Sequence, residues 1–329
     1  MKQDFKDALV LALSRRDAPA DGKWLTLNAE ILPDIDPAWR DAMTCEQGFR
    51  PEFLKLEKNG YQTSPVIGKL IDCAGAIVLA GRNRKVNEYN VLRAYNACTK
   101  GGSILISGDK KAGIAALRKW TASQFEISDS FSKYHAVVFE IKRTGDAAPL
   151  PSLEVPHEEF LIAEGMFSSD GPDIGSQILA EHFDKRIKGC VADFGAGWGY
   201  LSNQLLQASD RVEELDLFEA DYASLEAAKT NVKNESVKLS FNWCDLVSEF
   251  KKKPRHWVIM NPPFHSGRAT DPELGKKFIQ VAASTLPSGG RLLMVANRNL
   301  PYEDTLSKCF KRFETLETRD GFKVIEAVR

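Results

Sequence analysis

The segment Asn-Pro-Pro-Phe at residues 261–264 is the part of the sequence best suited to chemistry. Pro262 and Pro263 stiffen the turn because each proline fixes φ, so the carbonyl of Pro262 is held in one direction. The side-chain oxygen of Asn261 is a second fixed acceptor, and two acceptors can hold both hydrogens of a planar exocyclic amine. Phe264 can stack on the ring that carries this amine. Such a grip orients the nitrogen lone pair toward an electrophile and stabilises the charge developing on nitrogen. A plain turn is the alternative interpretation.

A glycine-rich segment lies upstream, in the run Asp-Phe-Gly-Ala-Gly-Trp-Gly. Gly195, Gly197 and Gly199 follow an apolar run and precede a helical pattern, where glycine lets the backbone approach a ligand at a helix N-terminus. The GxGxG spacing differs from the GxGxxG of nicotinamide enzymes, and no GK[ST] for a nucleoside triphosphate follows. Glu219 ends the next predicted strand, where an acid accepts both ribose hydroxyls of a nucleoside. An ordinary carboxylate at a strand end is the alternative.

Asp245 follows the third predicted strand of the second half. A carboxylate there can accept a hydrogen bond from an adenine amino group, and Cys244 or Trp243 can pack beside the ring. A helix N-cap is an equally good interpretation of Asp245 on its own.

These residues lie between the predicted elements of an α/β domain. The predicted strands are short and apolar, as in a parallel sheet covered on both faces, and they span residues 190–194, 214–219, 238–243, 256–260 and 291–296. Helical patterns alternate with them at residues 200–207, 221–232 and 271–286. Two strand-like runs around Asp320-Gly321 then predict a hairpin. The second half is therefore expected to form a doubly wound, mostly parallel sheet that ends in an antiparallel hairpin.

The two halves of the chain end alike. Gly101-Gly102 and Gly289-Gly290 are each followed by a short apolar run, a helical stretch, a strand, a turn and a final strand. The period of 188 residues is too long for a solenoid array, so the sequence predicts two copies of one α/β domain. Residues 144–156 contain three prolines and a Gly-Asp pair, which indicate a linker. We therefore expect domains at residues 1–150 and 151–329.

Charge is distributed unevenly between these halves. The whole chain has a net charge of −1, which does not indicate a general polyanion binder. Residues 1–150 hold 22 basic and 18 acidic side chains, whereas residues 151–329 hold 22 and 27. The basic run Lys-Lys-Lys-Pro-Arg-His at residues 251–256 is expected to be a solvated loop before the fourth strand rather than a phosphate site.

Composition excludes several classes of protein. The 329 residues suffice for roughly two domains of about 150 residues, and 43% hydrophobic with 27% charged residues is typical of a soluble globular protein. Six scattered cysteines form no CxxC pair and lie near no histidine at metal-ligand spacing, which favours a reducing cytosol over a disulfide framework or a zinc site. The apolar run at residues 8–13 is far too short for a membrane span. We expect a cytoplasmic, monomeric protein with no metal and no membrane partner.

The second half of the chain resembles the ribosomal RNA small subunit methyltransferase C-like family. Members of this family are guanine-N2 methyltransferases that use S-adenosylmethionine. The motifs that carry the resemblance are GMFSSDGPDIGSQIL (residues 165–179), DFGAGWG, LDLFEAD, NPPFH and LPSGGRLLMVANRNLPYE. The family has duplicated methyltransferase domains with a degenerate N-terminal copy, so the resemblance covers the whole chain in architecture and the second half by motif. It implies two tandem Rossmann-like domains and transfer of a methyl group to the 2-amino group of a guanine in ribosomal RNA, with 16S RNA or the 30S subunit as partner.

The resemblance also implies the residues of the site. The catalytic set would be Asn261, Pro262, Pro263 and Phe264. The set that binds S-adenosylmethionine would be Phe167, Asp193, Gly195, Ala196, Gly197, Gly199, Glu219, Ala220, Cys244, Asp245 and Asn261. One departure is that Glu219 stands where this family often has Asp, and both residues accept ribose hydroxyls.

The first half fits a copy that has lost its cofactor site. Aligning AIVLAGRN with WVIMNPPF puts Ala80 at the position of Asn261, and Arg82 and Asn83 at those of Pro263 and Phe264. This half is expected to have neither a glycine-rich loop nor an acid matching Glu219. Its basic side chains could contact RNA phosphates or form a solvated surface: Arg82, Arg84, Lys85, Arg93, Lys110, Lys111, Arg118 and Lys119.

Two other functions stay open from the sequence. One keeps the cofactor and changes the acceptor to a 23S RNA guanine, a DNA adenine or a protein glutamine. The other is a non-catalytic RNA-binding assembly protein, against which the intact glycine-rich loop, Glu219 and Asn261 argue.

Overall fold

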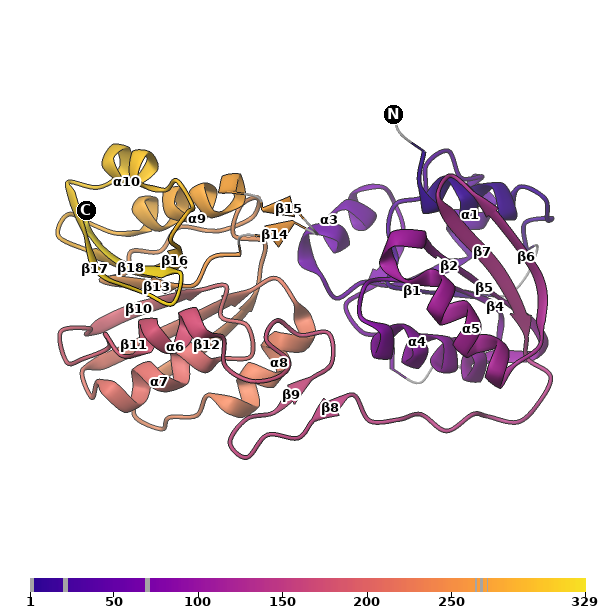
Figure 1. The fold of residues 1–329 in the computed structure, drawn as a ribbon, viewed down its shortest axis with the longest axis horizontal. Coiled ribbons are helices and arrows are strands. Elements are labelled where there is room, and N and C mark those ends of the chain that lie inside the picture. Colours follow the sequence, from indigo (N-terminus) through magenta and orange to yellow (C-terminus); the bar gives the residue numbers. More distant parts are fainter. Residues whose placement is uncertain (1–2, 20–22, 69–71, 264, 267–268, 271) are drawn as a thin grey trace. The chain divides into compact units, whose positions relative to one another are not determined.

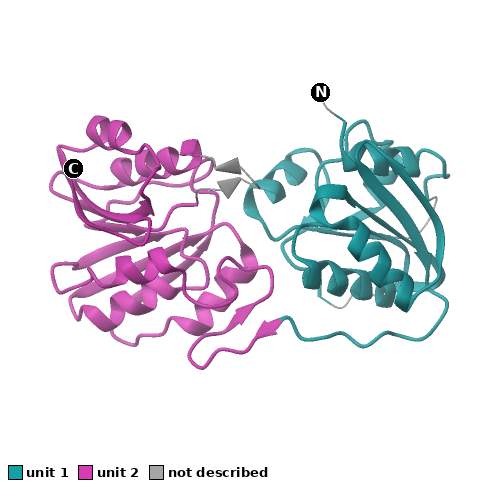
Figure 2. Cartoon of the chain, viewed as in Figure 1, with its two compact units in different colours: residues 1–153 teal, residues 154–329 magenta. Residues whose placement is uncertain are grey.

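The chain forms two compact units, residues Met1–Leu153 and Glu154–Arg329 (Figure 2). The computed structural model describes residues 3–19, 23–68, 72–263, 265–266, 269–270 and 272–329. The division between the units lies inside the proline-containing segment at residues 144–156, where each proline removes a backbone donor. Among the described residues, no helix is long and apolar enough to cross a membrane.

The second unit contains one seven-stranded sheet (Figure 1). Its strands are β10 (Gly189–Phe194), β11 (Val212–Glu219), β12 (Lys238–Trp243), β13 (Trp257–Met260), β16 (Arg291–Asn297), β17 (Arg312–Arg319) and β18 (Phe322–Val328). They lie in the order β12-β11-β10-β13-β16-β18-β17. The first five are mutually parallel, and β18 runs antiparallel to both of its neighbours. This confirms the predicted doubly wound sheet with its terminal hairpin, whose turn residues Asp320 and Gly321 have φ values of 51° and 83°.

Helices cover both faces of this sheet (Figure 1). One face carries α6 (Ile174–Ala180), α7 (Tyr200–Ala208) and α8 (Tyr222–Asn231), and the other carries α9 (Pro272–Thr285) and α10 (Glu303–Cys309). Leu205 and Ala228 are buried in the first layer, and Ile279 and Leu306 are buried in the second. Two short antiparallel pairs join β8 (Glu154–Val155) with β9 (Ile162–Ala163) and β14 (His265–Ser266) with β15 (Ala269–Thr270).

The first unit repeats the same sheet order. Its strands are β1 (Trp24–Leu27), β2 (Met43–Glu46), β3 (Gln62–Ser64), β4 (Cys73–Leu79), β5 (Cys98–Asp109), β6 (Ile127–Lys133) and β7 (Ala136–Lys142). They are ordered β3-β2-β1-β4-β5-β7-β6, which is the order of the second sheet strand for strand. Its helices are α1 (Phe5–Leu13), α2 (Pro37–Ala42), α3 (Arg50–Lys58), α4 (Arg84–Ala97) and α5 (Ile114–Gln124), with a 3-10 turn η1 at Lys110–Ala112. The prediction of two Rossmann-like domains is thus confirmed.

The first unit lacks a glycine-rich loop after β1. That strand is followed by Asn28, which has φ of 53° and whose side-chain amide donates to the carbonyl of Leu79 at 2.9 Å. Ala80 directly follows β4 in the way that Asn261 directly follows β13, as the alignment of the two halves predicts. At the position of Asn261 in the second unit, this unit therefore has only the methyl side chain of an alanine.

Two expectations for the first half are wrong. An acid does match Glu219, because Glu46 ends β2 just as Glu219 ends β11. Both oxygens of this carboxylate accept hydrogen bonds from the guanidinium of Arg93 in α4, Oε1 from Nη1 at 2.6 Å and Oε2 from Nη2 at 2.7 Å. Oε2 also accepts from the amide of Ile67. Arg93 consequently faces the interior, with its side chain 18% exposed, and is not placed to meet RNA. The remaining basic residues proposed for RNA, Arg82, Arg84, Lys85, Lys110, Lys111, Arg118 and Lys119, are exposed.

The basic run at residues 251–256 also differs from a fully solvated loop. Lys251 and Lys252 are exposed, but Lys253 pairs with Glu214 at 2.9 Å. Arg255 is only 3% exposed and pairs with Asp216 inside the sheet. A buried guanidinium needs a carboxylate partner, and this pair anchors the segment before β13.

Candidate active site

The candidate site lies at the carboxyl ends of β10, β11 and β13. These strands are parallel neighbours, so the loops that follow them meet at one edge of the sheet. A small cavity at this edge is lined by Phe167, Asp173, Ser176, the glycine-rich loop and Asn261. Segments that are far apart in the sequence therefore share one site, in the place where doubly wound folds bind ligands.

The three glycines after β10 serve the loop in different ways. Gly195, Gly197 and Gly199 have φ values of 75°, 55° and 94°, which disfavour any side chain. A Cβ on Gly199 would lie 2.5 Å from Cγ2 of Val232, so this glycine is needed for packing. A Cβ on Gly197 would meet nothing within 4 Å, so this glycine exposes backbone to open space. The loop is fixed from behind by the carbonyl of Phe218, which accepts from the amides of Gly195 and Ala196.

Glu219 connects three loops of the site. Its Oε2 accepts from the amide of Gly197 and its Oε1 from the amide of Asp221, both at 2.7 Å. Its own carbonyl accepts from the amide of Cys244 at 2.9 Å. Burial raises the pKa of Glu219 to about 7, against the opposing effect of these backbone donors. Each carboxylate oxygen has a further lone pair, so the group can still accept from a ligand.

Asp193 is a fully buried acid next to the site. It is the last residue but one of β10, and its Oδ2 accepts from Oγ of Ser202 at 2.7 Å. Its Oδ1 has no hydrogen-bond partner within the described part of the chain. Burial raises the pKa of Asp193 to about 7, and the charge of Glu219 adds to the shift.

Asn261 is held by α6. Its Nδ2 donates to Oδ2 of Asp173 and to Oγ of Ser176, both at 2.9 Å. The nitrogen of the amide therefore faces α6, and its oxygen is directed away from that helix. Pro262 is buried and Pro263 is exposed after it. Phe264 lies outside the described residues, so its stacking stays a prediction.

The remaining predicted residues lie around this core. The side chain of Phe167 is 59% exposed at the cavity, and its carbonyl accepts from Nε1 of Trp198 at 3.1 Å. The carbonyl of Ala220 accepts from Nε1 of Trp243 at 2.8 Å. Asp245 caps its own turn, accepting from the amide of Val247 and Oγ of Ser248. The alternative interpretation of Asp245 as a cap thus describes its contacts in this structure. Its contact with adenine stays a prediction.

Asp173 and Ser176 also belong to the site, and the sequence did not predict them there. Their Asp-x-x-Ser spacing predicts a helix N-cap, and Oδ2 of Asp173 indeed accepts from the amide of Ser176 at 3.1 Å. Nothing in the local sequence indicates that the same side chains hold Asn261, which is 88 and 85 residues away.

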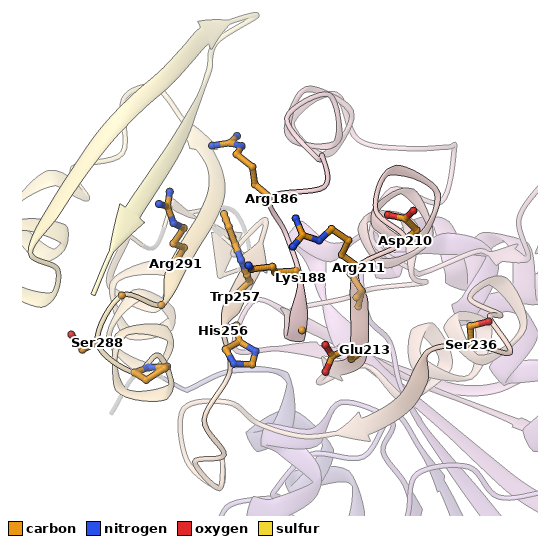
Figure 3. Close-up of a pocket in the computed structure, with 15 residues that line it drawn as sticks. Arg186, Lys188, Asp210, Arg211, Glu213, Ser236, His256, Trp257, Ser288 and Arg291 are labelled. Atoms are coloured by element: carbon orange, nitrogen blue, oxygen red, sulfur yellow. The ribbon is translucent and has the colours of Figure 1, made fainter.

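A larger cavity in this unit belongs to the opposite edge of the sheet (Figure 3). It lies at the amino ends of β10, β11, β13 and β16 and has a volume of about 1100 Å³. The guanidinium of Arg186 pairs with Asp184 and Glu326, and Arg291 pairs with the same Glu326. This cavity contains none of the predicted site residues.

The buried acid Asp193 generates a testable dependence of stability on pH. Its folded pKa of about 7 exceeds the unfolded value near 4, so the folded state retains a proton between these values. The free energy of unfolding therefore falls as pH rises from about 4 to 7. Above pH 7 the stability lost by ionising this buried carboxyl no longer increases. We expect Asp193→Asn, which carries no charge, to remove up to about 4 kcal/mol of this fall.

Urea unfolding of both proteins at pH 5 and pH 8 measures the part of this difference that develops between pH 5 and 7, about 2.7 kcal/mol. Comparing the two pH values separates the charge from any constant cost of a buried amide. Glu213→Gln, a change at an exposed carboxylate, serves as the control and should leave the pH dependence as it is in the wild type. Equal pH dependence in Asp193→Asn and wild type would show that Asp193 folds in its ionised form.

Comparisons with known proteins identify the family. Residues 157–326 match the family model of the methyltransferase small domain. The chain is 30% identical over 274 residues to ribosomal RNA small subunit methyltransferase C of Erwinia tasmaniensis, covering 79% of this chain and 77% of that protein. The protein of the same name from Escherichia coli is 27% identical, covering 78% and 76%.

Among solved structures, a T. thermophilus 16S rRNA N2 methyltransferase (RsmC) in complex with AdoMet and guanosine has the same fold. The match has a TM-score of 0.81 at 22% identity and covers 99% of this chain and 93% of that one. Its coverage includes both units, so the duplicated architecture is common to the two proteins. The matching domain, the relatives over more than three quarters of both lengths and the shared fold confirm the resemblance found in the sequence. This chain belongs to the ribosomal RNA small subunit methyltransferase C family.

Proposed function

We propose that this protein transfers the methyl group of S-adenosylmethionine to the exocyclic 2-amino group of a guanine in 16S ribosomal RNA. The observation that carries the proposal is the placement of Asn261, whose amide nitrogen is held by α6 beside the open backbone of Gly197. Support comes from the relatives, which are named ribosomal RNA small subunit methyltransferases, and from the T. thermophilus enzyme with AdoMet and guanosine.

The residues at the ends of β10 and β11 fit S-adenosylmethionine. Gly197 leaves open space where a side chain would otherwise stand, and the half-buried carboxylate of Glu219 has lone pairs left for two ribose hydroxyls. We place Phe167, Asp193, Ala196, Ala220, Cys244 and Asp245 around the same ligand. When bound, the cofactor supplies an electrophilic methyl group.

Asn261 and Pro262 act on the methyl acceptor. The side-chain oxygen of Asn261 and the carbonyl of Pro262 accept the two hydrogens of the amine, which directs its lone pair toward the methyl group. The same oxygens stabilise the positive charge that develops on nitrogen, and the surplus proton leaves to water. Phe264 stacks on the guanine. A paired guanine cannot present its amine in this way, so the base must be unpaired or extruded.

The first unit has the complementary task in this proposal. It has lost the cofactor site, and its exposed basic side chains hold structured RNA while the second unit does the chemistry. We further propose that the protein acts as a monomer in the cytoplasm, on the 30S subunit or its RNA.

Replacing Asn261 tests the proposed reaction. Asn261→Ala removes one acceptor from a site where charge develops, which should slow methyl transfer by about 2.7–4 kcal/mol, or about 100- to 1000-fold. The affinity for the cofactor should barely change, because Asn261 lies mainly on the side of the methyl acceptor. Single-turnover rates at saturating labelled cofactor and RNA measure the effect, and Asn234→Ala, in a loop after α8, is the matched control.

The choice of acceptor separates the competing functions. Label should enter 30S subunits or 16S RNA, and not 50S subunits, duplex DNA or a glutamine-containing release factor. Inosine in place of the target guanine should accept no methyl group, because it lacks the 2-amino group. If Asn261→Ala turned over as fast as the wild type, the Asn-Pro-Pro-Phe segment would be a structural turn with no role in the reaction.

The affinity for S-adenosylmethionine should depend on the ionisation of Glu219. A protonated carboxyl cannot accept from two hydroxyls, and the pKa of Glu219 is about 7 before the ligand binds. We therefore expect about tenfold tighter binding at pH 8 than at pH 6. Isothermal titration measures this and should give one site per chain.

Glu219→Gln keeps the side-chain size and should bind weakly at both pH values. Losing a charge-assisted contact costs about 1.5–3 kcal/mol. Glu213→Gln should titrate as the wild type does. Two sites per chain, or tight binding by Glu219→Gln, would contradict the assignment.

Charge reversal tests the RNA-binding role of the first unit. Changing the exposed Arg82, Arg84 and Lys85 to Glu should weaken RNA binding and flatten its dependence on salt, because fewer counterions are released. Cofactor affinity should stay constant. The matched control is charge reversal at Lys251 and Lys252, exposed residues of the second unit. An unchanged salt dependence in the first variant would assign its three residues to the solvated surface.

A further inference from the structure

The amide of Asn261 is committed to one orientation by two partners on a single helix. Both of its hydrogens have an acceptor, Oδ2 of Asp173 and Oγ of Ser176, each 2.9 Å from Nδ2. Asn261 follows β13 at the edge of the sheet, and both partners lie at the start of α6. An asparagine amide has a donor end and an acceptor end of nearly equal shape. The two contacts therefore decide which end faces away from α6.

The position of α6 is itself closely determined. A Cβ on Gly175 would lie 2.8 Å from the ring of Phe322, so the helix sits directly on β18. Ile178 and Leu179 are buried against the sheet on the same side. Oδ2 of Asp173 also accepts from the amide of Ser176, which ties this carboxylate to the first turn. The two acceptors are thus part of a packed element rather than of a free loop.

The orientation of this amide has a chemical consequence. With the nitrogen held by α6, the oxygen faces the group that receives the methyl group. There it can accept a hydrogen bond from an N–H of that group. The reverse orientation would direct an NH₂ group at the substrate amine, donor against donor. The carboxylate of Asp173 also polarises the amide through its hydrogen bond, which makes the oxygen a stronger acceptor.

We propose that Asp173 and Ser176 are positioning residues that make Asn261 an obligatory hydrogen-bond acceptor, and so restrict the methyl acceptor to a group that offers two N–H hydrogens. This inference rests on the proposed function and adds the determinant of its substrate class. It predicts selection for an amine carried on a planar ring and against a ring carbonyl or a ring nitrogen without hydrogen.

The double variant Asp173→Ser/Ser176→Ala tests the proposal. Serine is a good N-cap, so α6 keeps its cap, but serine is too short to take over the contact to Asn261. We expect single-turnover methylation of 16S RNA at saturating cofactor to fall about 10- to 100-fold. Asp36→Ser is the matched control, because Asp36 caps α2 in the first unit.

A double-mutant cycle with Asn261→Ala separates positioning from other effects. If Asp173 and Ser176 act through Asn261, adding their changes to Asn261→Ala should slow the reaction by less than about twofold further. A purely structural effect, or direct contact of Asp173 with substrate, would add its full cost in that background and would overturn the proposal.

The outcomes also separate this inference from the proposed function. Failure of the wild-type protein to methylate any guanine RNA would remove the proposed function and this inference with it. Wild-type methylation that is equally fast in Asp173→Ser/Ser176→Ala would leave the function standing and overturn the inference alone.

Discussion

The site depends most on the half-buried carboxylate of Glu219. Its two oxygens and its carbonyl hold the amides of Gly197, Asp221 and Cys244, which belong to the loops after β10, β11 and β12. Three loops are brought together by one residue because the sheet places these strands side by side. The carboxylate is desolvated in return, and its pKa rises to about 7. A group kept near its titration point can become ionised when hydroxyl donors arrive, which couples the architecture of the loops to ligand binding.

In the first unit, the position that corresponds to Glu219 has a different role. Glu46 ends β2 as Glu219 ends β11, but a guanidinium from α4 meets both of its oxygens. Removing Arg93 would not recreate a site, because Asn28 stands after β1 with its amide bonded to the carbonyl of Leu79. The carboxylate of Glu46 now stabilises the first unit from within, since an acid and a guanidinium that face each other satisfy both charges.

Local signals gave reliable predictions, and contacts between distant segments did not. The strand that ends at Glu219 and the hairpin at Asp320-Gly321 follow from apolar runs and turn residues, which neighbours in the sequence determine. The pairing of Asp173 with Asn261 spans 88 residues, and that of Glu46 with Arg93 spans 47. Such partners are chosen by the sheet order, which no local pattern contains.

The chemistry of this site agrees with the proposal that the RNA backbone is held by the first unit. Glu219 and Asn261 both present oxygen acceptors to the site, and Asp193 lies buried close behind them in β10. Hydrogen-bond acceptors at this edge of the sheet can bind ribose hydroxyls and an amine, which are donors. They repel a phosphodiester, which is negatively charged and offers only acceptors. The two halves of the sequence follow the same division, with residues 151–329 holding 22 basic and 27 acidic side chains and residues 1–150 holding 22 and 18. In the proposed function, attraction for the RNA backbone comes from the exposed basic side chains of the first unit, and that role would be a physical reason for keeping a second domain without a glycine-rich loop.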